Sequence, residues 1–219
     1  MTESQGFRSD SYSDSRTDIL RMIPQKPYRV LDVGCSTGNL GKSIKIKYNS
    51  YVLGLDSDLD SLSEAKSKID DVFQVDLDKF ENSLSDFDLI ICADVLEHTK
   101  YPANVLSEIS KCLTPEGSII ISLPNVQHWT VFLNLLLGKW PERDRGIFDY
   151  THLRFFTLNS IISLSSKCGF RIIKISRNFR LIDRPFHSLN KLSIIFKFLP
   201  LKNFFTYQYI VLLSRSQTC

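Results

Sequence analysis

The stretch Val30–Gly41, which reads VLDVGCSTGNLG, decides the expected fold of this 219-residue chain. It begins as an apolar strand, passes through small residues around Gly34 and continues into helical sequence. A turn of this kind, at the N-terminus of a helix, lets a ligand approach backbone N–H groups closely. The stretch therefore predicts the first strand, turn and helix of an α/β sheet, with a binding site at the turn.

Outward from this stretch, apolar strand signals alternate with helical ones. The expected strands are Tyr28–Val33, Tyr51–Asp56, Val72–Val75, Phe87–Ala93, Gly117–Leu123, Phe170–Ser176 and Tyr207–Leu213. The expected helices are Asp14–Ile23, one from the turn to about Tyr48, Leu59–Ile69, Pro102–Leu113, Trp129–Leu137 and one between Thr157 and Gly169. This alternation predicts a mostly parallel sheet covered by helices. Right-handed crossovers would place a crevice at the carboxyl ends of the strands, where the site is expected.

The composition is that of a globular protein, with 43% hydrophobic and 23% charged residues. No apolar run approaches the roughly 18 residues of a membrane span. The polar N-terminus has no signal-peptide core, and five scattered cysteines fit a reducing cytoplasm. Residues 1–138 carry 13 Lys and Arg against 20 Asp and Glu, whereas residues 139–219 carry 14 against 4. The basic last third predicts an anionic acceptor, contact with the inner face of a membrane, or a simple solvated face; no nucleic-acid partner is expected.

Two phosphate ligands are candidates for the turn. A dinucleotide site requires GxGxxG, but the corresponding positions hold Gly34, Ser36 and Asn39, so two of the three glycines are missing. A P-loop has the pattern GxxxxGK[ST], and Ser36–Ser43 (STGNLGKS) departs from it only at the first glycine. Asp32 lies just before the turn and would repel a phosphate in both cases, which disfavours both ligands.

A third candidate ligand carries a cationic sulfonium and an ammonium but no phosphate, so the acidic Asp32 favours it. The turn resembles the first motif of the class I S-adenosylmethionine-dependent methyltransferases, [DE]xGxGxG, with Asp32, Gly34, Ser36 and Gly38 at its positions and Ser36 replacing the middle glycine. The resemblance implies that this loop, with Cys35, holds the cofactor S-adenosyl-L-methionine. It also implies a Rossmann-like methyltransferase fold, a seven-stranded, mostly parallel sheet with helices on both faces and an antiparallel last strand.

Later strand ends extend the resemblance. Asp56 ends the second strand, where a carboxylate can accept hydrogen bonds from both ribose hydroxyls, and Ser57 follows it. Asp76 and Leu77 follow the third strand, and the resemblance implies that they contact the adenine. Phe87–Pro102 (FDLIICADVLEHTKYP) resembles the family's fourth motif, which lines the cofactor. Its members expected at the site are Ala93, Asp94, Leu96 and His98.

The resemblance covers essentially the whole chain and implies one domain over residues 1–219. Residues 1–27 are expected to form an N-terminal cap, in which Tyr12 and Arg16 close over the cofactor and Arg16 pairs with its carboxylate. Residues 124–156 are expected to form a substrate lid, and residues 179–205 an insertion between the last two strands. The chain resembles a bacterial subgroup similar to ubiquinone O-methyltransferases and to methyltransferases found with surface-polysaccharide assembly.

Histidines are concentrated in the expected crevice and its lid. His128 and His152 are the candidate bases for the acceptor's proton, since imidazole titrates near neutral pH, and Asp149 is expected to orient His152. Arg154 is expected either to bind an anionic acceptor or to hold the lid through an ion pair. The residues expected to bind the substrate are Asn125, Trp129, Arg154 and Phe155. No metal-ligand cluster stands out in the sequence, so catalysis is expected to need no metal.

The leading hypothesis is O-methylation of a hydroxyl on a small or carrier-linked acceptor, such as a sugar of a surface glycan. Within the same family, N-methylation and methyl transfer to a quinone precursor are alternatives. Outside it, a catalytically silent cofactor-binding module and a P-loop-like nucleotide binder are alternatives.

Overall fold

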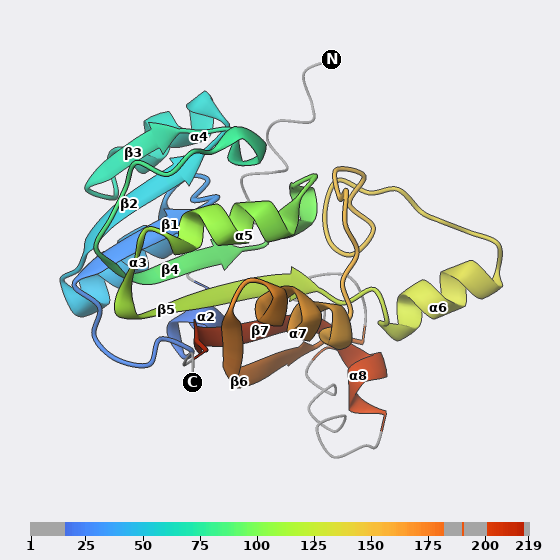
Figure 1. The fold of residues 1–219 in the computed structure, drawn as a ribbon. Coiled ribbons are helices and arrows are strands. Elements are labelled where there is room, and N and C mark those ends of the chain that lie inside the picture. Colours follow the sequence, from blue (N-terminus) through green and yellow to red (C-terminus); the bar gives the residue numbers. More distant parts are fainter. Residues whose placement is uncertain (1–15, 182–189, 191–200, 217–219) are drawn as a thin grey trace.

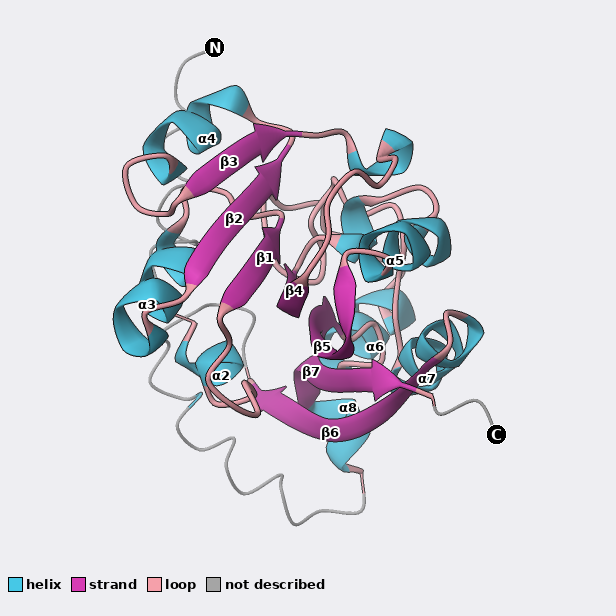
Figure 2. Ribbon diagram, turned by 60° about the vertical axis from the view of Figure 1, so that its left-hand side comes forward, coloured by secondary structure: helices cyan, strands magenta, loops and turns pink. Residues whose placement is uncertain are grey.

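Seven strands form one sheet in the order β3-β2-β1-β4-β5-β7-β6, as Figure 2 shows. The computed structural model describes residues 16–181, 190 and 201–216. All neighbouring strands are parallel except at β7, which runs antiparallel to both β5 and β6. The strands are β1 (Arg29–Val33), β2 (Tyr51–Asp56), β3 (Asp71–Gln74), β4 (Phe87–Ala93), β5 (Leu113–Pro124), β6 (Phe170–Phe179) and β7 (Thr206–Arg215). The predicted Rossmann-like sheet with an antiparallel last strand is confirmed.

Helices pack on both faces of this sheet (Figure 1). On one face α5 and α7 bury residues such as Leu106 and Ile161. On the other face α2, α3 and α4 bury Ile19, Ile44 and Leu62. The described helices are α2 (Thr17–Leu20), α3 (Asn39–Tyr48), α4 (Leu59–Ala65), α5 (Pro102–Ser110), α6 (Trp129–Leu136), α7 (Leu158–Lys167) and α8 (Lys202–Phe205), with short 3-10 turns η2 (Leu77–Lys79) and η3 (Leu96–His98).

Local capping explains where several helices begin. Asp58 accepts a hydrogen bond from the Ser61 N–H and starts α4. Thr157 and Ser160 exchange side-chain and backbone hydrogen bonds in a capping box at the start of α7. Pro102 occupies the first turn of α5, where a missing N–H costs nothing. These are the signals from which the sequence predicts the helix starts correctly.

The structure has shorter helices and longer C-terminal strands than the sequence predicts. α4 ends at Ala65 and α5 at Ser110, several residues before the expected ends at Ile69 and Leu113. β6 and β7 are longer than expected because they pair along most of their lengths, and β5 extends back to Leu113, which pairs with Phe87 of β4. The expected helix Asp14–Ile23 is reduced to α2 within the described residues. Tyr12 and most of the expected insertion at 179–205 lie outside the described residues.

One helix stands apart from the two layers. Figure 1 shows α6 projecting away from the sheet, and its side chains Phe132, Leu135 and Leu136 are 58%, 58% and 71% exposed. None of the described helices combines the length and apolar character that a bilayer-spanning segment requires.

The register of the parallel strands brings the candidate site residues to one edge. Val33 at the end of β1 pairs with Leu55 of β2 and with Cys92 of β4. Ala93, the last residue of β4, pairs with Ser122 of β5. The loops after β1, β2, β4 and β5 therefore begin side by side, as expected for the crevice of a doubly wound sheet.

Candidate functional site

The loop after β1 is tightly packed against the loop after β4 and against α4. Gly34 has a φ of +72°, and a Cβ placed on it would lie 2.8 Å from Val95 Cγ2. Gly38 has a φ of +75° and a Cβ there would lie 3.0 Å from the backbone of Ala65. Both positions therefore require glycine for conformation and for space. Ser36, which replaces the middle glycine of the motif, adopts a φ of +46°.

The backbone N–H groups of this loop already have partners. Gly34 and Cys35 both donate to the carbonyl of Leu55, at 2.7 and 3.0 Å. Ser36 donates to Asp56 Oδ2 at 2.7 Å, and Gly38 donates to the carbonyl of Cys35. A phosphate site of the P-loop or dinucleotide type depends on such N–H groups pointing at the ligand. Their internal use argues against both phosphate interpretations of the sequence.

Asp56 lies at the end of β2 with its carboxylate fixed by two backbone donors. Oδ2 accepts from Ser36 N–H and Oδ1 accepts from Asp58 N–H at 3.0 Å. Each carboxylate oxygen can accept a further hydrogen bond, so the group retains capacity for ribose hydroxyls. Ser57 is exposed, and its carbonyl accepts from Gln74. These positions agree with the predicted nucleoside site at the edge of the sheet.

Asp76 is exposed at the end of β3, where it caps η2 and pairs with Lys79 at 3.0 Å. Leu77 is half-buried beside it. The neighbouring Asp78 has a different task, because it accepts from the backbone N–H groups of Lys100 and Tyr101. Of the two carboxylates, Asp76 is therefore the one that can meet a ligand.

Asp32 lies beneath the loop and is only 1% exposed. Burial, together with the nearby charge of Asp56, raises the pKa of Asp32 to about 7, while Arg16 and a backbone hydrogen bond from Gly41 act in the opposite direction. Its Oδ2 has no hydrogen-bond partner among the described residues. Asp32 can thus affect a ligand through its charge rather than through an exposed carboxylate.

Five polar side chains close into a hydrogen-bonded loop at the same edge of the sheet. This polar ring comprises Arg16, Asp18, Asn178, Gln208 and Asp94. Arg16 Nη1 donates to Asp94 Oδ2 at 2.6 Å and Arg16 Nε donates to Asp18 Oδ1 at 3.1 Å. Asn178 Nδ2 donates to Asp18 Oδ2 and Gln208 Oε1, and Gln208 Nε2 donates to Asp94 Oδ1.

Arg16 therefore has two carboxylate partners within the chain. Burial alone would lower the pKa of Arg16, but Asp94 and Asp18 outweigh it and raise the pKa. Sequence reasoning predicts that Arg16 pairs with the cofactor carboxylate. The structure places it at the expected edge, but with Asp94 and Asp18 as its partners.

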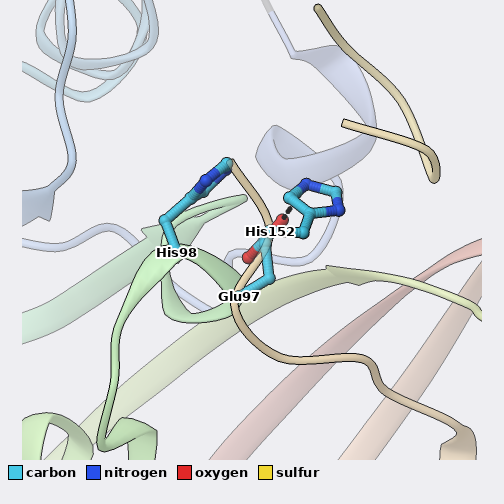
Figure 3. Close-up of side chains that lie close together, drawn as sticks. All are labelled: Glu97, His98 and His152. Carbon is cyan, nitrogen blue, oxygen red and sulfur yellow. Dashed lines mark ion pairs between the residues drawn. The ribbon is translucent and has the colours of Figure 1, made fainter. Parts of the chain in front are cut away.

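Figure 3 shows three side chains from two loops, Glu97, His98 and His152, lying close together. Asp94 is near enough for its charge to act on Glu97. His152 Nε2 lies 4.0 Å from Glu97 Oε1, and the two imidazole centroids are 4.8 Å apart. The backbone carbonyl of Glu97 accepts from the N–H groups of Leu153 and Arg154, which ties the lid to η3. We call Glu97, His98 and His152 the histidine–glutamate cluster. No local pattern in the sequence indicates this grouping, and its three side chains lie close enough together to be potential metal ligands.

The expected link from Asp149 to His152 is indirect. Asp149 Oδ1 accepts from the hydroxyl of Thr151 at 2.6 Å, and that hydroxyl lies 3.0 Å from Nδ1 of His98. Asp149 therefore orients His98 through Thr151. Burial and the neighbouring His98 lower the pKa of His152, while Asp149 and a hydrogen bond to the backbone of Ile147 act in the opposite direction.

His128 does not have the environment of a base. It is fully buried, with Nδ1 2.8 Å from Thr130 Oγ1 and Nε2 2.8 Å from the carbonyl of Arg180. Burial lowers its pKa to about 4. Because both ring nitrogens are engaged inside the protein, the structure corrects the interpretation of His128 as a candidate base and gives it a structural role.

The residues expected to bind substrate have varied environments. Asn125 is buried, and its amide donates to the carbonyls of Asn203 and Thr206, which corrects its expected role to a structural one. Arg154 makes no ion pair in the described residues and instead donates to the carbonyl of Lys100, at 3.0 and 2.6 Å. It holds the lid, as one interpretation expected, but through a carbonyl.

Aromatic side chains line the outer part of the lid. Phe155 is 49% exposed and packs edge-to-face against Trp140, with centroids 5.6 Å apart. Trp129 is half-buried, with its indole N–H unpaired among the described residues. Phe155 thus remains a candidate for contact with an acceptor, together with Trp140.

The positions of the remaining motif residues are mixed. Leu96 and Cys35 are buried and support the loops by packing in the core, whereas Ala93 and Asp94 are half-buried at the strand end. Sequence reasoning missed Glu97, although it lies inside the quoted DVLEH segment. A glutamate between apolar residues and a histidine was the available signal. The other four members of the polar ring come from the start of α2, from β6 and from β7, so no local signal links them to Asp94.

The residues present fit a cationic nucleoside. The glycines of the loop after β1 allow its close packing on Val95 and Ala65, and the N–H groups of Gly34, Cys35, Ser36 and Gly38 are satisfied without a phosphate. Carboxylates at the ends of β2 and β3 can accept hydrogen bonds from ribose hydroxyls and from an amino group. Asp56 and Asp76 would hold the nucleoside of S-adenosylmethionine, and the loop at Gly34 would hold its methionine part.

Comparisons with known proteins agree with this architecture. Residues 5–175 match a family model described as a methyltransferase domain. The mitochondrial ubiquinone biosynthesis O-methyltransferase of Candida albicans is 29% identical over 166 residues, which cover 72% of this chain and 51% of that protein. The chain spans about half the length of the first curated relatives it matches.

Solved structures extend the likeness of fold. A methyltransferase from Archaeoglobus fulgidus, described as dependent on S-adenosylmethionine, aligns with a TM-score of 0.68 at 19% identity, over 97% of this chain and all of that one. The magnesium protoporphyrin IX methyltransferase of Synechocystis, crystallised with S-adenosylhomocysteine, aligns with a TM-score of 0.63 at 18% identity, over 95% and 84% of the two chains. With the family model covering most of its length, this chain belongs to the class I S-adenosylmethionine-dependent methyltransferases.

Proposed function

We propose that this chain transfers the methyl group of S-adenosylmethionine to a hydroxyl oxygen of a small acceptor. The observation that carries the proposal is the arrangement of the sheet edge. Carboxylates that can hold a nucleoside lie at the ends of β2 and β3, and the histidine–glutamate cluster lies next to Asp94 at the end of β4. The donor and the proton-handling groups would thus be adjacent.

The chemistry divides between the donor and the protein. Bound S-adenosylmethionine supplies an electrophilic methyl group on a sulfonium that leaves as a neutral thioether. The protein has to align the acceptor oxygen, exclude water and accept one proton. Alignment of two bound reactants can contribute on the order of 7–11 kcal/mol. A positioned base adds about 10²–10⁴-fold.

His152 is the candidate proton acceptor. Its ring lies in the lid and faces Glu97, and its side chain is 5% exposed. The acceptor O–H bond would break toward His152 as the new O–CH₃ bond forms. His128 is not a candidate because both of its nitrogens are engaged.

The acceptor class follows from two sources of support. The curated relative from Candida albicans is named for ubiquinone biosynthesis, which favours a phenolic hydroxyl of a ring compound. The exposed aromatic pair of Trp140 and Phe155 could stack on such a ring or on a sugar. A phenolic hydroxyl is therefore the first acceptor class to test, and the sugar hydroxyl of a surface glycan is the second.

We also propose that the protein works in the cytoplasm beside an anionic membrane. The exposed apolar residues of α6 support this, since such a helix can lie in the headgroup region when basic residues are near. Lys139 and Lys202 supply charge at α6 and α8. Sedimentation with vesicles of anionic and of neutral lipid tests it. Equal binding to both would contradict an electrostatic contribution.

Calorimetry tests the donor assignment. S-adenosylmethionine and S-adenosylhomocysteine are expected to bind, and ATP is not. Binding of ATP without the other two would overturn the methyltransferase proposal in favour of a nucleotide binder.

Turnover tests catalysis separately. With a panel of phenols and sugars, the wild-type chain is expected to release S-adenosylhomocysteine, and His152→Asn to reduce kcat by about 10²–10⁴-fold. His128→Asn serves as a comparison that should affect stability more than kcat. Donor binding without turnover on any acceptor would favour the catalytically silent module.

A further inference from the structure

The histidine–glutamate cluster brings three potential metal ligands together from two separate loops. Glu97 and His98 belong to η3 after β4, and His152 belongs to the lid. One ligand atom from each lies within 4.8 Å of the other two. Donor atoms around a single tetrahedral ion lie about 3.3 Å apart, given metal–ligand distances of about 2.0–2.2 Å. Side-chain rotations that move the ligand atoms by about 1 Å would therefore bring all three to bonding distance of one ion.

Glu97 is a buried carboxyl group whose burial is offset only in part, by a backbone hydrogen bond and the charge of Arg16. It is 1% exposed, and its Oε2 has no hydrogen-bond partner among the described residues. Its Oε1 is directed at His152, at 4.0 Å. Burial, and after it the charge of Asp94, raise the pKa of Glu97 well above its usual range, and Asp149 adds to the effect. A buried carboxylate is unfavourable unless a cation or hydrogen bonds offset it, so this position favours a positive ion.

The groups behind the two histidines are those expected of metal ligands. Nδ1 of His98 lies 3.2 Å from the carbonyl oxygen of Thr151, and the Thr151 hydroxyl is held by Asp149. This arrangement fixes the imidazole ring of His98 and leaves its Nε2 for another partner. His152 in turn makes a hydrogen bond to the backbone of Ile147 while its Nε2 faces Glu97. Metal-bound imidazoles commonly donate their second N–H to a carbonyl or carboxylate in this way.

We propose that Glu97, His98 and His152 bind one divalent transition-metal ion, such as Zn²⁺ or Mn²⁺. Two imidazoles and one carboxylate suit ions of this class, whereas Mg²⁺ and Ca²⁺ prefer all-oxygen sites. Three protein ligands leave at least one coordination position open. The site differs from a closed structural zinc site in that respect.

The open position suggests what the ion does, and this part of the inference rests on the proposed function. The cluster lies within electrostatic range of Asp94 and Arg16 at the expected donor end. An acceptor hydroxyl bound to the ion would be oriented and acidified, and its proton would pass to solvent before methyl transfer. With the ion bound, Nε2 of His152 would be a ligand and could not also accept a proton, so the ion would replace His152 in the proton-accepting role proposed above for the metal-free chain.

Metal binding can be measured without donor, acceptor or turnover. Tag-free protein, stripped with a chelator, is titrated with ZnSO₄ and with MnCl₂ by calorimetry, and bound metal is counted after gel filtration by elemental analysis. We expect one ion per chain. Glu97→Gln keeps the side-chain volume and removes the charge, and it should weaken binding at least about 100-fold, since even residues behind a ligand change affinity 10–100-fold.

Glu81→Gln is the matched control, because Glu81 is exposed and distant in sequence from the cluster. It should bind metal as the wild-type chain does. If Glu97→Gln fails to fold by circular dichroism, His98→Asn replaces it, with the same expected loss.

The outcomes separate the two proposals. Absent or weak metal binding by the wild-type chain, or binding unchanged in Glu97→Gln and His98→Asn, would overturn the metal site. If S-adenosylhomocysteine still binds in that case, the methyltransferase proposal stands. If metal binds but neither S-adenosylmethionine nor S-adenosylhomocysteine does, the proposed function fails and the metal site stands.

Discussion

Two neighbouring aspartates, Asp56 and Asp58, separate ligand binding from helix capping. Asp56 ends β2 with a carboxylate that can accept from a ribose, while Asp58 caps α4. Asp56→Asn keeps an acceptor for Ser36 N–H but loses the charge-assisted bonds, so the Kd for S-adenosylhomocysteine should rise about tenfold or more. Calorimetry measures this directly.

The control is Asp58→Ala. It should lower the free energy of unfolding by about 1 kcal/mol, as loss of an N-cap does, and leave the Kd unchanged. An equal loss of affinity in both variants would remove Asp56 from the nucleoside site.

Asp32 gives a charge-dependent prediction because its pKa is raised to about 7. As pH rises from 6 to 8 the group loses its proton, and the added negative charge favours a cationic sulfonium over a neutral thioether. The affinity for S-adenosylmethionine relative to S-adenosylhomocysteine should therefore increase over this range, by up to about tenfold. In Asp32→Asn this affinity ratio should not change with pH. A rising ratio in the variant would show that another group is responsible.

His128 links stability to pH. Its folded-state pKa of about 4 lies below the ordinary value of 6.5, so the unfolded chain binds a proton first as pH falls. Its contribution is fully present above about pH 6.5 and declines as pH falls toward 4, by up to about 3 kcal/mol. Urea unfolding of wild type and His128→Gln at pH 7.5 and 5 should give a smaller pH dependence for the variant. Parallel pH profiles would contradict the assignment.

At the scale of elements, the loop after β1 depends on space as well as on backbone conformation. Gly34→Ala adds a Cβ 2.8 Å from Val95 and should weaken S-adenosylhomocysteine binding at least tenfold while lowering stability. Gly138 has a similar φ of +67°, with nothing within 4 Å of an added Cβ. Gly138→Ala should therefore show only the conformational cost, about 1–2 kcal/mol, with unchanged binding in the same calorimetric assay.

Elements were predictable from the sequence where the signals were local. The capping of α4 and α7, the glycine loop and the positions of the strands along the chain all follow from short patterns. The confirmed family also follows from motifs at strand ends. Tertiary contacts were not predictable in this way. The burial of His128 depends on Arg180, and the histidine–glutamate cluster depends on the lid returning to η3.

At the scale of the molecule, the polar ring connects α2 with β6, with β7 and with Asp94 at the end of β4. Asn178→Ala would disconnect Asp18 from Gln208. We expect faster hydrogen exchange at the amides of Ile19 and Leu20, because α2 loses an anchor. Arg171→Ala, on the same strand but exposed, is the control. Unchanged exchange in Asn178→Ala would mean that apolar packing alone holds α2.

The position of β7 has a consequence for biosynthesis. This strand lies between β5 and β6, both of which precede it in the chain. A nascent polypeptide that has emerged only to residue 205 carries two strands whose shared neighbour has not yet been made, and each presents an open hydrogen-bonding edge. The ribosome must therefore deliver residues 206–215 before the sheet can close, and until then the exposed edges are targets for chaperones.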